Sequence, residues 1–389
     1  MDRAVLTRAS KARARELAPS PGRWLRPHSL RLLALALPLT LAAWLAGCGS
    51  APQAAAPAAA TAQGQVAAAP TPAAPSGAME GARGSIVGQN ASLAIYVPVA
   101  GDTLQGVATR VLGDPGRAWR IAEANGQNWA PAAGAPLVVP LGKGNPLGVN
   151  GDSYQTVPIL CYHRFGSGSS KMLVAPAQFE AQLDWLARHH YKVLRLRDLA
   201  GFLSGREPLP QRSVVITIDD GYESVYRHAY PALKKHGFSA TLFVYSDFVG
   251  ARDGLSWAQL QEMAASGVID IQAHSKSHRN LIERSVGETE AGYRQSIETE
   301  VRQPRQVLER RLAAAGVQVR HFAFPFGDAN ELVLESMERH EYSLGVTVNP
   351  GGNPFFAQPT MLRRTMIFGD HDLEDFKARL QTRRSFARP

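Results

Sequence analysis

Cysteine is scarce in this sequence, and its scarcity excludes a fold held together by disulfide bonds. Only Cys48 and Cys161 occur among 389 residues, and two cysteines cannot form a disulfide framework. Cys161 stands in an apolar run, where we expect a buried, inert thiol. A hydrophobic core must therefore stabilise the fold, and the length allows one large domain and a small one.

A basic pattern typical of nucleic-acid binding is also missing. The formal net charge is +9, but residues 1–47 contain eight basic and two acidic side chains, so about +3 remains for the rest of the chain. Outside that segment no basic stripe alternates with aromatic residues. Nucleic acid is therefore not an expected partner.

The apolar run near the N-terminus is too short to cross a membrane. It covers residues 32–46, whereas a transmembrane helix needs roughly twenty residues. A basic segment precedes it and Leu45-Ala46-Gly47-Cys48 ends it, which is a secretory pattern. These four residues resemble the bacterial lipobox, and the resemblance implies a lipid anchor on Cys48. No aspartate follows Cys48, and in Gram-negative bacteria this resembles a lipoprotein sent to the outer membrane, so we expect an anchor there that faces the periplasm. The alternative is an ordinary signal peptide with a chance cysteine.

Composition divides the chain into four expected parts. Residues after Cys48 are rich in Ala, Pro, Gln and Gly, and such a segment cannot bury enough apolar surface to offset its ordering entropy. The expected parts are a signal peptide over 1–47, a disordered tether over 48–93, a small α+β module over 94–142 and, after a Gly-rich linker, a large domain over 153–389.

The small module has the pattern strand, helix, helix, strand. Asp102 or Thr103 can cap the first helix, whose apolar residues share one face. This pattern resembles the LysM module, which binds glycans that contain N-acetylglucosamine, such as peptidoglycan. The matching positions are Gly101-Asp102-Thr103-Leu104, Trp119, Ile121, Asn125 and residues 137–140. A spacer that binds nothing is the alternative.

In the large domain, apolar runs alternate with helical patterns. This alternation predicts a parallel sheet, open or closed into a barrel, with functional residues beyond the strand ends. One long helix is expected over 288–315, or two helices if Pro304 breaks it. The expected strands are 157–162, 192–196, 214–218, 240–245, 269–273, 322–326, 344–348 and 362–368.

Two carboxylates and two histidines stand at such strand ends. Asp219 and Asp220 follow an apolar strand, where adjacent like charges are costly unless something positive is near. Gly221 lets the chain turn so that both can reach one site. His274 and His278 are four apart, which on a helical turn places both rings on one face. We interpret the set as a metal held by both histidines and one aspartate, with the other aspartate doing proton chemistry.

The motifs at these positions resemble the polysaccharide deacetylase family, carbohydrate esterase family four. The resemblance covers nearly all of residues 157–380, and it implies a distorted (β/α)7 barrel that removes N-acetyl groups from polysaccharides. It also implies that Asp219 is the general base, that Asp220, His274 and His278 bind Zn²⁺ or another divalent ion such as Co²⁺ or Ni²⁺, and that the backbone N–H of Phe326 holds the oxyanion. The matching stretches are Thr217-Ile218-Asp219-Asp220-Gly221, His274-Ser275-Lys276-Ser277-His278 and Phe324-Pro325-Phe326-Gly327.

The sequence departs from the family pattern twice. Many members have an arginine that orients the base where this chain has Ala323, and Arg363 or Arg364 on the last strand is the candidate replacement. The C-terminal Leu-x-x-His motif of the general acid is also missing. His163, after the first strand, is the better candidate for a catalytic role than His371, which falls in a loop. Candidate substrate-binding residues are Tyr222, Pro325 and Arg363.

The expected substrate is a glycan polymer of the N-acetylglucosamine type. Peptidoglycan is favoured because of the LysM-like module, and poly-N-acetylglucosamine of a biofilm matrix is the second choice. The missing arginine and histidine leave a rival hypothesis, a non-catalytic cell-wall glycan-binding lipoprotein. A third hypothesis is an esterase that acts on O-acetyl groups.

Overall fold

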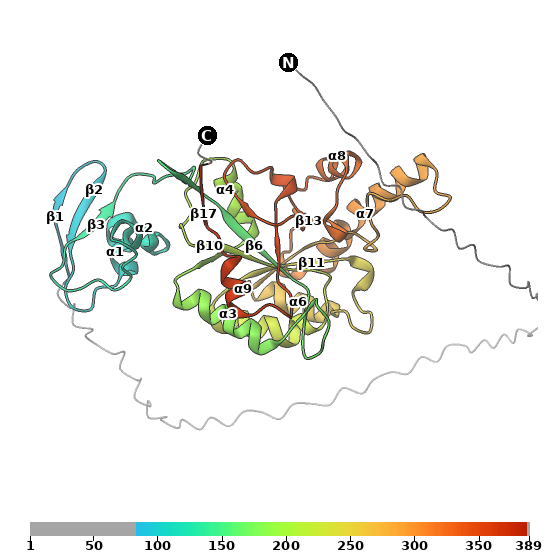
Figure 1. Cartoon of the computed structure of the whole chain (residues 1–389), viewed down its shortest axis with the longest axis horizontal. Helices are drawn as coiled ribbons and strands as arrows, with labels where there is room; N and C mark the ends of the chain where they lie inside the picture. The colour runs from blue at the N-terminus through green and yellow to red at the C-terminus, as the bar shows by residue number, and fades with distance from the viewer. Residues whose placement is uncertain (1–82, 387–389) are drawn as a thin grey trace, which may run out of the picture. The chain divides into compact units, whose positions relative to one another are not determined.

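The computed structural model describes residues 83–386 (Figure 1). The predicted signal peptide, the lipidation site Cys48 and most of the expected tether lie outside these residues. Among the described helices, none combines the length and the apolar character that crossing a bilayer requires.

A three-stranded antiparallel sheet and two helices form the small module. Its elements are β1 (Ser85–Gln89), β2 (Leu93–Val97), α1 (Leu104–Leu112), α2 (Ala118–Ala124) and β3 (Leu137–Pro140), with sheet order β1-β2-β3. The order β2, α1, α2, β3 is the predicted one, and the Thr103 side chain caps α1 by accepting from the Gly106 N–H. The tether was expected to reach residue 93, but β1 lies within it. All five side chains of β1 are exposed, so no apolar alternation marks this strand in the sequence.

Seven parallel strands form the ring of the large domain. They are β6 (Val157–Tyr162), β10 (Ser213–Ile218), β11 (Ala240–Val244), β12 (Ile269–Ala273), β13 (His321–Ala323), β14 (Leu344–Val346) and β16 (Thr365–Met366). Neighbours pair in the order β14-β13-β12-β11-β10-β6, and β16 pairs with β6. A parallel bridge between Val346 and Leu362 joins β14 to the segment that leads into β16. The predicted distorted (β/α)7 barrel is therefore confirmed.

Additional short strands account for the distortion. β9 (Lys192–Leu194) pairs with the start of β10, and β15 (Gly352–Asn353) runs antiparallel to β6. Outside the ring, β4 (Val149–Asn150), β5 (Ser153–Gln155) and β17 (Arg383–Ser385) form a small sheet, and β7 (Arg164–Phe165) pairs with β8 (Leu173–Val174).

Helices surround the strands (Figure 1). They are α3 (Pro176–Arg188), α4 (Leu199–Leu203), α5 (Tyr230–His236), α6 (Trp257–Ala265), α7 (Glu290–Arg311), α8 (Glu331–Arg339) and α9 (Leu373–Ala378). Single turns of helix lie at Pro115–Arg117, Leu196–Asp198, Val225–Ala229, Ser246–Phe248, Ala313–Ala315, Pro325–Gly327 and Pro359–Met361. The long helix α7 continues through Pro304 instead of breaking there.

Alternate residues of the strands belong to two cores. Leu160, Ile216 and Leu242 pack in a cluster with helix residues such as Leu183 and Leu233. Their neighbours along the same strands lie in a second buried cluster, whose members include Ile159, Val215, Phe243, Val346 and Leu362. Because successive strand side chains point to opposite faces, the strands must be apolar on both faces, which explains their continuous apolar runs.

Candidate active site

The predicted site residues meet at the end of the ring where the parallel strands finish. Asp219 and Asp220 follow β10, and His274 follows β12. They line a cavity of about 330 Å³ together with His163, His278, Tyr222 and Phe326. The carboxyl ends of parallel strands are where barrel enzymes gather their functional groups, so the topology brings these residues together as the sequence predicted.

Asp220, His274 and His278 form a compact set of potential metal ligands. Asp220 Oδ1 lies 3.3 Å from His278 Nε2 and 3.5 Å from His274 Nε2, and the three ligand atoms lie within 4.8 Å of one another. His274 Nδ1 lies 2.8 Å from the carbonyl oxygen of Ala323. A donating Nδ1–H leaves the Nε2 lone pair free for a metal. Burial raises the pKa of Asp220, but the two neighbouring histidines lower it by more, so the pKa is well below its ordinary value.

The two histidines do not lie on a helix, and that part of the prediction is wrong. Residues 274–278 form an irregular turn in which Ser275 (φ 67°) and His278 (φ 63°) are left-handed. The Ser275 Oγ accepts a hydrogen bond of 2.9 Å from the His278 N–H. The chain reversal brings both rings to Asp220 and replaces the expected helical spacing.

Asp219 makes a two-point contact with a buried arginine. Arg364 donates from Nη1 to Oδ1 and from Nη2 to Oδ2, both at 2.7 Å. Arg364 is fully buried, and its Nε donates to the Thr347 carbonyl at 2.8 Å. Burial raises the pKa of Asp219, whereas the charges of Arg364 and His274 lower it to below its usual value. The carboxylate is therefore ionised at neutral pH and ready to accept a proton.

Arg364, not Arg363, lies beside Asp219, where an arginine that orients the base is expected. The Arg363 guanidinium donates to the Pro350 carbonyl at 3.2 Å and does not line the cavity around Asp219. The structure therefore gives no support to Arg363 as a substrate-binding residue of this cavity. Pro325 is buried and does not line this cavity either, so the structure gives no support to a direct substrate contact from it.

Left-handed backbone shapes the two sides of the cavity. Asp220 (φ 73°) and Gly221 (φ 94°) turn the chain after β10, and a Cβ on Gly221 would lie 3.1 Å from Val244 Cγ1. On the other side Phe326 has φ 61° and Gly327 has φ 89°. Strained conformations of this kind are held at functional sites by the surrounding structure. They allow Asp219 and Asp220 to face one site although they are neighbours.

Three further predicted residues border the cavity. His163 Nδ1 is buried without a hydrogen-bond partner among the described residues, and burial lowers the pKa of the ring. Tyr222 forms part of the wall, with the Arg164 guanidinium 4.4 Å from its ring centroid. Phe326 is 60% exposed, and its ring centroid lies 5.0 Å from that of His278. His371 bonds to the Phe368 N–H and contacts Arg379, and it does not line the cavity.

Residues 206–345 match the family model of polysaccharide deacetylases. Over 195 residues the chain is 33% identical to YxkH of Bacillus subtilis, which is named as a polysaccharide deacetylase. Residues 206–345 of the barrel therefore belong to the polysaccharide deacetylase family. The family match contains both aspartates, both ligand histidines and Phe326, whereas His163 and Arg364 lie outside it on either side.

Other relatives of this deacetylase-family barrel carry more specific names. The poly-beta-1,6-N-acetyl-D-glucosamine N-deacetylase of Staphylococcus aureus is 26% identical over 193 residues, or 47% of this chain. YxkH matches 50% of this chain. The chain spans 65% of the length of both curated relatives.

Solved structures show the same fold. The deacetylase PplD of Streptococcus pyogenes, determined with acetate, is 26% identical with a TM-score of 0.52 and matches 58% of this chain and 98% of its own. IcaB from Ammonifex degensii is 28% identical with a TM-score of 0.52, and matches 59% of this chain and 98% of its own.

The donor chemistry of Asp220, His274 and His278 fits a catalytic divalent metal, because two imidazoles and one carboxylate leave a further position open. Two other groups in residues 83–386 have a similar composition. In the group Cys161, His163 and Asp219 the carboxylate is already held by Arg364. The group Glu180, Asp184 and His236 lies at the surface, where Lys235 pairs with Glu180. Asp220, His274 and His278 therefore form the best-suited set.

Proposed function

We propose that the barrel is a metal-dependent hydrolase that removes N-acetyl groups from an N-acetylglucosamine-type polysaccharide. One observation carries the proposal: an ionised carboxylate, Asp219, is held by a buried arginine beside a ligand set of two histidines and one aspartate. Zn²⁺, Co²⁺ or Ni²⁺ in that set would polarise the acetamide carbonyl and make the attacking water more acidic.

The side chains then account for the movement of protons. Asp219 accepts a proton from the water that attacks the acetyl carbon. Arg364 keeps the carboxylate ionised and oriented through its two contacts. By resemblance to the family, the Phe326 N–H donates to the oxyanion. The bond between the acetyl carbon and the sugar nitrogen breaks, and acetate and a free amine are released.

The leaving nitrogen needs a proton, and we assign its delivery to His163. Burial lowers the pKa of this ring, so it is neutral at pH 7 and fits a relay role better than that of a charged acid. Ligand atoms of His163 and Asp219 lie within 4.8 Å of each other. One ring nitrogen of His163 can take the proton that Asp219 has accepted from the water. The other ring nitrogen can give a proton to the amine.

Two polymers are candidate substrates. Peptidoglycan is the first, because the LysM-like module has a pattern associated with glycans of that kind. Poly-N-acetylglucosamine is the second, because a relative from Staphylococcus aureus is named for its deacetylation. The rival hypothesis of a non-catalytic wall-binding protein was motivated by the missing arginine and histidine, and the contact between Arg364 and Asp219 supplies the base-orienting arginine.

Acetate release from chito-oligomers, peptidoglycan and poly-N-acetylglucosamine tests the proposal, with Zn²⁺, Co²⁺ or Ni²⁺ added. We expect release by the wild type and a fall of about 10²- to 10⁴-fold in Asp219→Asn, since that is the usual contribution of a positioned base. Equal release by Asp219→Asn contradicts the mechanism. Binding to peptidoglycan without release on any glycan supports the wall-binding hypothesis, and hydrolysis of aryl acetates alone supports an esterase.

We also propose that Cys48 carries a lipid that anchors the protein in the outer membrane, facing the periplasm. The Leu45-Ala46-Gly47-Cys48 pattern supports this proposal. Labelling of the expressed protein with a radioactive fatty acid and fractionation of the membranes test it. We expect label and outer-membrane recovery in the wild type, and neither in Cys48→Ala.

A further inference from the structure

The turn that carries both ligand histidines is strained and needs outside support. Ser275 and His278 have φ values of 67° and 63°, in a region that residues other than glycine seldom adopt. His278 is also less deeply buried than His274, with 26% of its side chain exposed against 2%. Surrounding contacts must therefore hold the His278 ring beside Asp220.

Glu300 of α7 supplies that support. Its Oε2 accepts from the N–H groups of Lys276 and Ser277, both at 2.9 Å, and its Oε1 accepts from Ser277 Oγ at 2.6 Å. These donors belong to residues between the two ligand histidines. Glu300 is only 6% exposed, and within residues 83–386 it forms no ion pair of its own. The three hydrogen bonds therefore provide its direct polar contacts.

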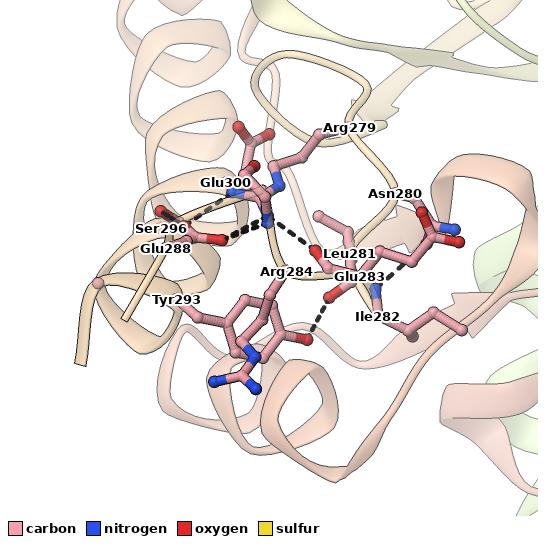
Figure 2. Close-up of polar contacts among 12 residues, drawn as sticks. Arg279, Asn280, Leu281, Ile282, Glu283, Arg284, Glu288, Tyr293, Ser296 and Glu300 are labelled. Atoms are coloured by element: carbon pink, nitrogen blue, oxygen red, sulfur yellow. Dashed lines mark hydrogen bonds and ion pairs between the residues drawn. The ribbon is translucent and has the colours of Figure 1, made fainter. Parts of the chain in front are cut away.

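Hydrogen bonds and an ion pair connect the chain after His278 to residues at the start of α7. Figure 2 shows Arg279 facing Glu288, which also accepts from Ser296 Oγ of α7. The Tyr293 hydroxyl of α7 donates to the Leu281 carbonyl at 2.6 Å. These contacts hold residues beyond the turn, whereas Glu300 touches the backbone between the ligands. Ser246 and Asp247 also contact the turn, through backbone N–H groups that donate to the carbonyls of Ser275 and Lys276. Glu300 contacts the turn through a side-chain carboxylate, so its effect on ligand geometry can be tested by substitution.

We propose that Glu300 is a positioning residue for the metal site, which fixes the place of His278 relative to Asp220 and His274 and so sets the affinity for the metal. The inference rests on the proposed function only in assuming that a divalent metal binds there. Residues that orient metal ligands without touching the metal commonly change metal affinity about 10- to 100-fold when they are mutated.

Glu300→Gln tests the inference, with Glu298→Gln as the matched control. Glutamine keeps the length and shape but replaces one accepting oxygen with an NH₂ group that cannot accept a hydrogen bond. Glu298 lies on the same helix, two residues away, and its contacts are Ser336 at 3.0 Å, Arg339 at 3.1 Å and His340. Both variants lose a carboxylate from α7, but only Glu300→Gln alters the ligand turn.

Titration of the metal-free full chain with Co²⁺, followed by visible absorption, gives the affinity without any substrate. We expect the Kd of Glu300→Gln to rise about 10- to 100-fold with a changed Co²⁺ spectrum, and the Kd of Glu298→Gln to stay at the wild-type value. An unchanged Kd and spectrum in Glu300→Gln overturns the inference. An equal rise in both variants also overturns it, because the effect is then a general loss of stability.

A milder variant covers the case in which Glu300→Gln does not fold. Ser277→Ala removes the donor to Oε1 and leaves both backbone donors in place, so we expect a smaller rise in the Co²⁺ Kd, and an unchanged Kd overturns the inference. Acetate release by the same preparations separates the two proposals. A wild type that releases no acetate while Glu300→Gln weakens Co²⁺ binding defeats the proposed activity and leaves the inference standing. Acetate release by the wild type together with an unaltered Co²⁺ Kd in Glu300→Gln supports the proposed activity and defeats the inference.

Discussion

Among individual residues, Asp219 and Arg364 form the contact on which the proposed chemistry depends most. Both are buried, with 2% and 0% of their side chains exposed. Taking two charges out of water is costly unless the geometry is good and further hydrogen bonds satisfy the remaining groups. Here the two-point contact is supplemented by bonds from Arg364 to the Thr347 carbonyl and Thr217 Oγ1. The arrangement keeps a carboxylate ionised in an apolar place.

Arg364→Gln is expected to raise the pKa of Asp219, because burial raises that pKa and Arg364 is the largest opposing influence. The acidic limb of the pH profile of kcat/KM then moves to higher pH, and kcat falls. Removing one partner of a buried ion pair also destabilises the fold by about 3–5 kcal/mol. Arg363→Gln is the control, because that side chain does not line the cavity. An unmoved acidic limb in folded Arg364→Gln contradicts this account of Asp219.

Gly327 follows the residue that we expect to hold the oxyanion. A Cβ there would lie 2.3 Å from Val348 Cγ2, at a φ of +89°. Gly327→Ala should therefore cost more than the roughly 1 kcal/mol of an unfavourable φ alone, and it should lower kcat by displacing the Phe326 N–H. Gly267→Ala is the control, since Gly267 has φ +71° and open space around it. Urea unfolding and kcat of both variants test this, and equal losses of stability contradict the role of the clash.

The sequence predicts the site residues that belong to contiguous motifs. For the other site residues it only narrows the choice to a few candidates. Asp219, Asp220, His274 and His278 stand in short motifs at strand ends, so they could be named in advance. Arg364 could be named only as one of two adjacent arginines, because the sequence does not show which of them faces the barrel interior. Arg364 and Asp219 are 145 positions apart, and the contact exists only because the last strand returns beside the first.

At the scale of elements, strand interiors were predictable and strand ends were not. Runs that are apolar on both faces identify β6, β10, β11 and β12 almost to the residue. β13 was expected to continue to residue 326, but Pro325 cannot donate a ladder hydrogen bond and Phe326 is left-handed. β1 was missed because an exposed edge strand leaves no apolar pattern.

β13 also contains a buried histidine that should make the stability depend on pH. His321 is 4% exposed, and burial lowers its pKa from 6.5 to about 4. Between these two values the unfolded chain binds a proton that the folded chain does not. Above pH 6.5 the ring is neutral in both states, and His321 does not change the free energy of unfolding with pH. Below pH 6.5 the free energy of unfolding falls as the pH drops towards 4, by up to ~1.4 kcal/mol per pH unit.

His321→Gln should remove that dependence. The variant is expected to be less stable than the wild type at pH 8, because its packing is altered, and the difference should shrink by up to about 3 kcal/mol at pH 4.5. Urea midpoints measured every half pH unit give the two curves. Parallel curves across this range contradict the assignment to His321.

At the scale of the whole molecule, the closure of the strands into a ring could not be predicted from local sequence patterns. Open and closed parallel sheets share the same alternation of strands and helices, so the residues alone left both possible and the family resemblance selected the barrel. The bridge between Val346 and Leu362 and the pairing of β16 with β6 close the ring. Closure encloses the second core and carries Arg364 to Asp219.

Metal binding should stabilise the whole domain, because the ligands come from segments that follow β10 and β12 and meet only in the folded state. A metal at 100 times its Kd adds about 2.7 kcal/mol, which for a domain of this size raises Tm by roughly 5–11 °C. Thermal unfolding of protein treated with a chelator, before and after addition of Zn²⁺, measures the rise. Asp220→Asn should abolish it, because Asp220 contacts both histidines.

Glu180→Gln is the matched control for this measurement, since Glu180 belongs to the surface group with Asp184 and His236. The rise in Tm should survive in this variant, because that group is partly exposed and already paired with Lys235. A rise that persists in Asp220→Asn and disappears in Glu180→Gln would place the metal at the surface, and the buried carboxylate beside Arg364 would then have no metal to work with.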